Sequence, residues 1–142
     1  PHDWMMLTGG AIGQGMPLAL GASLAAPDRK TLCITGDGAG MYTNQALWSM
    51  AREGANVVNV VFVNHSYRIL NIELARTGAG NPGPAAQELL GLGHPEIDWV
   101  KLSEAQGVPA VNATNAEEFD LALGRAFAAD GPQLIAAHVP AR

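Results

Sequence analysis

Short apolar runs, separated by glycine and proline, alternate along this chain with longer stretches of helical periodicity. The near-continuous β-branched run at residues 57–63 is typical of a strand buried on both faces of a parallel sheet. Apolar positions between residues 43 and 53 recur at helical spacing, and Gly54 follows where a helix would end. With another buried strand predicted at residues 30–35, these segments indicate a right-handed βαβ unit whose two strands end at the same edge.

The rest of the chain continues this alternation. Residues 4–8 predict a short strand, and residues 17–26 predict a closely packed helix with Pro17 in its first turn. The glycine- and proline-rich residues 78–95 predict an irregular loop, either functional or a surface excursion. The other predicted elements are a helix at 97–107, a strand at 109–111, a helix at 117–129 and a strand at 133–139. The pattern predicts an α/β fold: a doubly wound, mainly parallel sheet with helices on both faces.

The length, charge and cysteine content of the chain argue against several classes of function. The 142 residues suffice for one domain and are too few for two ordinary ones. A net charge of −5 without any lysine or arginine cluster argues against nucleic-acid binding. No apolar stretch approaches the ~20 residues of a membrane span. The single cysteine, Cys33, lies in an apolar run and excludes an intrachain disulfide, which fits a reducing compartment, so we expect a cytoplasmic location.

A carboxylate stands in the glycine-rich turn that follows the predicted strand at 30–35. The turn reads G-D-G-A-G from Gly36, which lacks the spacing of the Rossmann fingerprint, and the chain has no Walker sequence. Asn64 follows the next strand, so it should lie beside Asp37 at the carboxyl edge of the sheet. Asp37 would repel a phosphate unless a divalent cation lay between them, and Mg²⁺ takes such oxygen ligands together with substrate phosphates.

These motifs resemble the cofactor-binding domain of thiamine-diphosphate-dependent enzymes. An asparagine follows the aspartate of the G-D-G motif by 27 positions, as in that family. The sequence GGAIGQGMPLALGASLAAPDRK is similar to the segment before that motif in benzoylformate decarboxylase, pyruvate decarboxylase and acetolactate synthase. The sequences IDWVKLSEAQGV and GPQLIAAHV resemble the segments that close the same domain. The resemblance covers nearly the whole chain and implies thiamine diphosphate and Mg²⁺ as cofactors.

The resemblance also implies how the metal and the diphosphate are held. Asp37 and Asn64 would be the magnesium side-chain ligands, and Ser66 would contribute its main-chain carbonyl. The turn itself belongs to the cofactor-binding set, with N–H groups of the following helix directed at the diphosphate. Its implied members are Gly36, Gly38 and Ala39.

Further positions follow from the same resemblance. The Gly10 carbonyl would bind the aminopyrimidine amine, and Ile12 would force the two cofactor rings into their bent conformation. The residues after the asparagine turn would line the substrate pocket: Ile69, Leu70 and Glu73. Because pyruvate decarboxylases have a glutamate at the position of Leu70, that subgroup is disfavoured. Acetolactate-synthase-like and benzoylformate-decarboxylase-like activities on 2-oxo acids both remain open.

Two positions depart from the family pattern, and one functional group is absent. Val63 replaces the first of two asparagines that are common before the turn, and Ala39 replaces a frequent serine. The glutamate that activates the cofactor belongs to an N-terminal pyrimidine-binding domain, usually of a partner subunit. We therefore expect residues 1–142 to form the C-terminal domain of a longer, three-domain, homo-oligomeric enzyme, inactive alone. The alternative is a noncatalytic binding or assembly module with the same fold.

Overall fold

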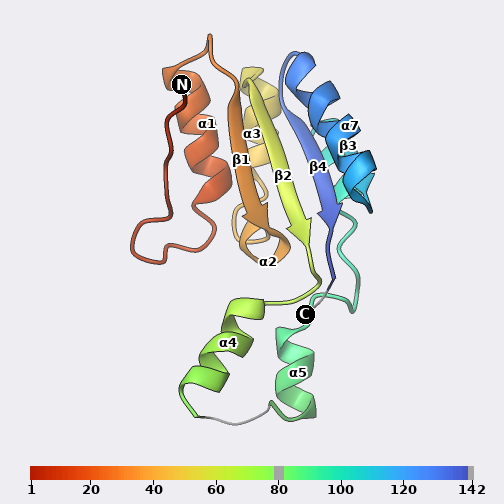
Figure 1. Cartoon of the computed structure of the whole chain (residues 1–142). Coiled ribbons are helices and arrows are strands. Elements are labelled where there is room, and N and C mark those ends of the chain that lie inside the picture. The colour runs from red at the N-terminus through yellow and green to blue at the C-terminus, as the bar shows by residue number, and fades with distance from the viewer. Residues whose placement is uncertain (79–81, 141–142) are drawn as a thin grey trace.

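The computed structural model describes residues 1–78 and 82–140, and its centre is a parallel sheet (Figure 1). The strands are β1 (Thr31–Gly36), β2 (Val57–Val63), β3 (Ala110–Ala113) and β4 (Gln133–His138). They lie in the order β1-β2-β4-β3, and every neighbouring pair is parallel. The predicted parallel sheet is confirmed, and β2 has the predicted bounds because its β-branched residues are buried on both faces.

Helices cover both faces of this sheet, as predicted. The helices of the described residues are α1 (Gly15–Ala25), α2 (Asp37–Gly40), α3 (Ala46–Glu53), α4 (Arg68–Arg76), α5 (Pro84–Leu90), α6 (Trp99–Glu104) and α7 (Ala116–Ala128). On one face, α1, α3 and α6 pack Met16, Leu47, Met50 and Trp99 into a single buried cluster. On the other face, α7 packs Ala126 against β2 and β4 (Figure 1). The doubly wound α/β architecture is therefore confirmed.

Local sequence explains several helix ends. Gly54 ends α3 in the left-handed conformation with φ of 60°, which glycine adopts without strain. The Asn115 side chain begins α7 by accepting the Glu118 N–H at 2.9 Å. The Asp98 side chain begins α6 in the same way, accepting the Lys101 N–H at 3.0 Å. Each cap satisfies a backbone donor that the first helical turn would leave unpaired.

The strand predicted at residues 4–8 is wrong. These residues are in no strand, and their large side chains are exposed, Trp4 at 72% and Met6 at 71%. In the described part of the chain, β1 is an edge strand that pairs with β2 alone. An apolar run forms a strand only where an edge pairs with it, and residues 4–8 have no such partner among the described residues.

The loop predicted at residues 78–95 is wrong in part, because it contains α5; residues 79–81 of that stretch lie outside the described residues. Pro84 occupies the first turn of α5, where its missing N–H costs nothing. Beyond the carboxyl ends of the strands, α4 and α5 lie side by side, and neither has a buried residue among those described (Figure 1).

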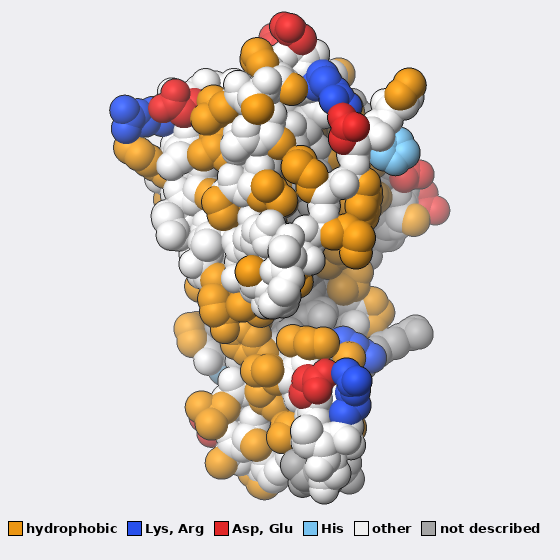
Figure 2. All heavy atoms as spheres, turned by 90° about the vertical axis from the view of Figure 1, so that its left-hand side faces the viewer, with side chains coloured by type: hydrophobic (Ala, Val, Ile, Leu, Met, Phe, Trp, Pro, Cys, Tyr) orange, Lys and Arg blue, Asp and Glu red, His pale blue; other side chains and the backbone are white. Residues whose placement is uncertain are grey.

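Figure 2 shows the side of the molecule that carries the N-terminal segment and α1, where apolar side chains spread over much of the surface, and charged side chains lie at the upper rim and in a second group in the lower half. Several large apolar side chains of this segment, α1 and β1 are more than 40% exposed: Trp4, Met5, Met6, Leu7, Leu24, Leu32 and Ile34. Exposed apolar surface of this extent commonly marks an interaction face. Among the described residues, no helix has the length and apolar character needed to cross a bilayer.

Candidate cofactor-binding site

Asp37 joins the carboxyl ends of β1 and β2. It directly follows β1, is 2% exposed, and accepts the Gly38 N–H through Oδ1 at 2.8 Å. Its Oδ2 accepts the N–H groups of Asn64 at 3.2 Å and His65 at 2.7 Å. These donors compensate for burial of the carboxylate. The structure thus brings together Asp37 and Asn64, which the sequence predicted to be neighbours.

The turn after β2 arranges further oxygen atoms beside this carboxylate. The Asn64 Oδ1 accepts the Ser66 N–H at 3.0 Å, which fixes the direction of the amide side chain. His65 has a φ of 56°, a left-handed conformation that turns its N–H toward Asp37. No hydrogen bond to the Ser66 carbonyl oxygen is found within residues 1–78 and 82–140. A carboxylate, an amide oxygen and a free carbonyl are ligands that suit Mg²⁺.

The glycine turn supplies backbone donors next to these oxygens. The Gly38 N–H is engaged by the side chain of the preceding aspartate, whereas the described residues contain no acceptor for the Ala39 N–H. Gly36 is extended at the start of α2 and leads the chain out of β1. The turn therefore holds one unpaired N–H group beside the buried carboxylate, and the roles of these three residues toward a diphosphate stay predictions.

The loop before α1 lies at the same end of the sheet (Figure 1). Gly10 is left-handed with φ of 71°, and its carbonyl accepts the Ile12 N–H at 2.8 Å. The Ile12 side chain is 40% exposed and so is available to a ligand or another domain. The Thr43 hydroxyl donates to the Gly13 carbonyl at 2.5 Å and ties this loop to the segment after α2.

The predicted substrate-lining residues lie on α4, beyond the turn after β2. Leu70 and Glu73 line an open hollow of about 330 Å³ with Leu74, Thr77 and Leu90. Ile69 is not among the residues that line the hollow and is 53% exposed. The Glu73 carboxylate also accepts from the Arg76 guanidinium at 2.8 Å. The structure thus brings together two of the three predicted residues in one mainly apolar hollow.

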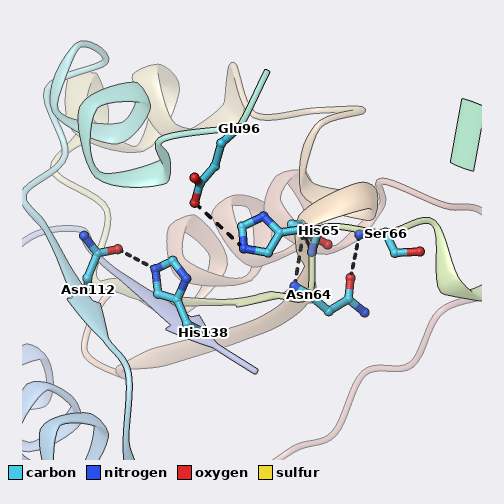
Figure 3. A network of polar contacts seen from close by, with 7 residues as sticks. Asn64, His65, Ser66, Glu96, Asn112 and His138 are labelled. Carbon is cyan, nitrogen blue, oxygen red and sulfur yellow. Dashed lines mark hydrogen bonds and ion pairs between the residues drawn. The ribbon is translucent and has the colours of Figure 1, made fainter. Parts of the chain in front are cut away.

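A network of polar side chains beside the turn was missed from the sequence (Figure 3). The His65 ring points toward Glu96, 3.8 Å away, and forms an ion pair only when protonated. Its centroid is 6.1 Å from that of His138, whose Nε2 lies 2.8 Å from Asn112 Oδ1. Part of this network could have been predicted from the sequence, because Asn112 and His138 lie on neighbouring parallel strands. The described residues contain no group of three or more histidine, cysteine, aspartate or glutamate side chains that could hold a metal.

Comparisons with known proteins agree with this geometry. Residues 1–137 match the family described as thiamine pyrophosphate enzyme, C-terminal TPP binding domain. The chain is 54% identical over 140 residues to a Mycobacterium tuberculosis protein provisionally named acetolactate synthase large subunit IlvX, covering 98% of this chain and 27% of that protein. It is 36% identical over 135 residues to Pseudomonas aeruginosa benzoylformate decarboxylase, covering 95% of this chain and 24% of the relative.

A solved structure of a thiamine diphosphate-dependent enzyme has a similar fold. The structure of the Rhodococcus jostii RHA1 thiamine diphosphate-dependent 4-hydroxybenzoylformate decarboxylase superposes with a TM-score of 0.80 and 37% identity. The superposition covers 92% of this chain and 23% of that structure. The chain therefore spans about a quarter of the length of the relatives it matches.

Proposed function

Because this chain belongs to the family of C-terminal thiamine-pyrophosphate-binding domains of thiamine pyrophosphate enzymes, we propose that it holds thiamine diphosphate through Mg²⁺. The Asp37 carboxylate, the Asn64 amide oxygen and the Ser66 carbonyl would be the protein's ligands to the metal. The single observation that carries the proposal is the contact between the Asp37 carboxylate and the N–H groups of Asn64 and His65. This contact holds together, at the carboxyl edge of the sheet, proposed metal ligands that follow two different strands.

The donor set suits magnesium and not a softer metal. Mg²⁺ takes six oxygen ligands and commonly keeps waters and substrate phosphates among them, so three protein oxygens leave room for a diphosphate. Zinc and copper sites in proteins use histidine and cysteine more often; the only cysteine is buried in the core, and the ring of His65 in this turn points toward Glu96. Lone pairs remain on the carboxylate and amide oxygens in addition to the hydrogen bonds they accept.

Residues around the turn would have distinct tasks. The Ala39 N–H, unpaired among the described residues, would bind a phosphate oxygen, and the Gly38 N–H would be shared between Asp37 Oδ1 and the diphosphate. Gly36 would allow the chain to leave the strand. The Gly10 carbonyl would orient the aminopyrimidine, and Ile12 would press the cofactor into its bent shape. Thiamine diphosphate, when bound, supplies a carbanion centre and an electron sink for reactions at 2-oxo acids. The domain itself would hold the diphosphate of the cofactor and form one wall of the substrate pocket, from which it excludes water.

The reaction of the whole protein is the next part of the proposal. Relatives named benzoylformate decarboxylase and acetolactate synthase support an enzyme that decarboxylates or ligates 2-oxo acids, a lyase or a transferase. The apolar hollow by Leu70 favours a substrate with a hydrophobic or aromatic group, with Ile69 and Glu73 nearby. An N-terminal pyrimidine-binding domain of the same or a partner subunit would complete the site in a cytoplasmic homo-oligomer.

Calorimetric titration tests the binding step. The purified chain is titrated with thiamine diphosphate in Mg²⁺ and in EDTA, beside Asn64→Ala and the control Asn44→Ala. We expect binding that requires Mg²⁺, is weakened at least tenfold in Asn64→Ala, and is unchanged in the control. Among the described residues, the Asn44 side chain bonds only the Met41 carbonyl and the Gln106 amide. A folded chain that binds no cofactor when joined to its N-terminal domain would contradict the proposal and favour a noncatalytic module.

A further inference from the structure

Gly38 is a glycine because of a neighbouring side chain. Its φ is not among the positive values that the described glycines adopt, so its backbone conformation is open to other residues. A Cβ placed on Gly38, however, would lie 2.7 Å from Cδ1 and 2.9 Å from Cε1 of Tyr67. Those separations are far below van der Waals contact. The edge of the Tyr67 ring therefore rests directly on the glycine turn.

Backbone hydrogen bonds hold the segment that carries this ring. The Tyr67 N–H donates to the Leu90 carbonyl at 2.9 Å, and the Leu92 N–H donates to the His65 carbonyl at 2.7 Å. These bonds form an antiparallel bridge between residues 66 and 91. Leu92 Cδ1 would also lie 3.5 Å from the same Cβ. The segments before α4 and after α5 thus hold the ring against the turn together.

The hydroxyl of Tyr67 has no structural task of its own. The residue is half-buried, and no hydrogen bond to its hydroxyl is found in the described part of the chain. The oxygen is not one of the buried polar atoms without a partner, so solvent reaches it. A phenylalanine would pack against Gly38 equally well. The hydroxyl is bonded to Cζ, the ring atom next to Cε1, so it extends beside the glycine turn. In that turn Ala39 has no polar side chain and can donate to a ligand only through its backbone N–H group.

We propose that Tyr67 is a further cofactor-contacting residue of this site. Its ring braces the Gly38 turn, and its hydroxyl donates a hydrogen bond to a phosphate oxygen of the diphosphate. This inference rests on the proposed function, because the phosphate is that of the cofactor held by the same turn. It adds a side-chain donor, from the residue that begins α4, to a site otherwise made of backbone N–H groups and a metal.

Two tyrosine variants separate the hydroxyl from the ring. Tyr67→Phe removes only the hydroxyl, and Tyr42→Phe is the matched control at the other tyrosine, which is 55% exposed. Dissociation constants are measured by calorimetry in Mg²⁺ for thiamine diphosphate and for inorganic pyrophosphate. The thermal midpoint without ligand reports folding. Since a hydrogen bond to a charged acceptor is strong, Tyr67→Phe should weaken both ligands about tenfold or more, with its ligand-free midpoint unchanged.

The outcomes distinguish this inference from the proposed function. Equal affinities in the native chain and Tyr67→Phe would overturn the inference and leave the proposed function standing. So would a loss of affinity for thiamine diphosphate alone, because the contact would then not be to phosphate. If the full-length protein with the native sequence bound neither ligand, both the inference and the proposed function would be wrong. Weakened binding of both ligands in Tyr67→Phe, but not in Tyr42→Phe, supports the inference.

Discussion

Asp37 should stabilise the fold even without a metal, because its carboxylate connects two strands. The sharpest perturbation is Asp37→Asn, which keeps the shape of the side chain and replaces one oxygen by an NH₂ group. The native carboxylate accepts N–H groups through both oxygens, at 2.8 Å through Oδ1 and at 3.2 and 2.7 Å through Oδ2. In either orientation of the amide, at least one backbone N–H faces another donor.

The magnitude follows from these contacts. One hydrogen bond to a charged acceptor, worth about 1.5–3 kcal/mol, is lost, and the remaining ones become weaker because the acceptor is neutral. Relief of the buried charge offsets part of this loss. We therefore expect the free energy of unfolding to fall by about 2–4 kcal/mol. For a chain of this length, the thermal midpoint should fall by roughly 5–15 °C.

Urea unfolding in EDTA measures this loss with no metal present. The native chain, Asp37→Asn and the control Asp120→Asn, which changes an exposed aspartate on α7, are compared by circular dichroism. We expect the full loss in Asp37→Asn and a change within about 0.5 kcal/mol in the control. If Asp37→Asn were as stable as the control in EDTA, Asp37 would not hold the strands together, and the reasoning from its hydrogen bonds would be wrong.

Three further predictions test other parts of the structure. Gly40→Ala should destabilise the chain by about 1–3 kcal/mol in urea unfolding, because its Cβ would lie 2.7 Å from a ring atom of Trp99; an unchanged midpoint would refute that packing. Burial raises the pKa of the Cys33 thiol to about 11, so iodoacetamide at pH 8 should modify the folded chain far more slowly than the urea-unfolded chain, and equal rates would contradict this. Asn115→Ala should cost about 1 kcal/mol in the same unfolding assay through loss of the α7 cap, and no loss would show that the cap is dispensable.

Segments whose structure depends on local pattern were predictable. The β-branched run of β2 reads as a buried strand in any context, and Gly54 ends α3 through its own backbone freedom. The pairing of Asp37 with Asn64 was predictable because parallel strands share a carboxyl edge, so residues that end two strands become neighbours. These features need only short-range sequence and one topological rule.

Features that depend on distant partners were not predictable. Residues 4–8 have the apolar pattern of a strand, but that pattern does not reveal whether the segment pairs with a sheet edge, and the outer edge of β1 is unpaired among the described residues. In α5, Pro84 and the flanking glycines are equally typical of a loop. The contact of Tyr67 with Gly38, and that of His65 with Glu96, follow from the path of the chain through α4 and α5. No spacing in the sequence encodes that path.

Locating the metal tests the central claim most directly. Crystals of the protein grown with thiamine diphosphate and Mn²⁺ in place of Mg²⁺ would give an anomalous signal at the ion. The account predicts one peak at about 2.0–2.3 Å from the Asp37 carboxylate, the Asn64 side-chain oxygen and the Ser66 carbonyl, with diphosphate oxygens completing the shell. A bound cofactor whose metal lies away from these three oxygens would contradict it.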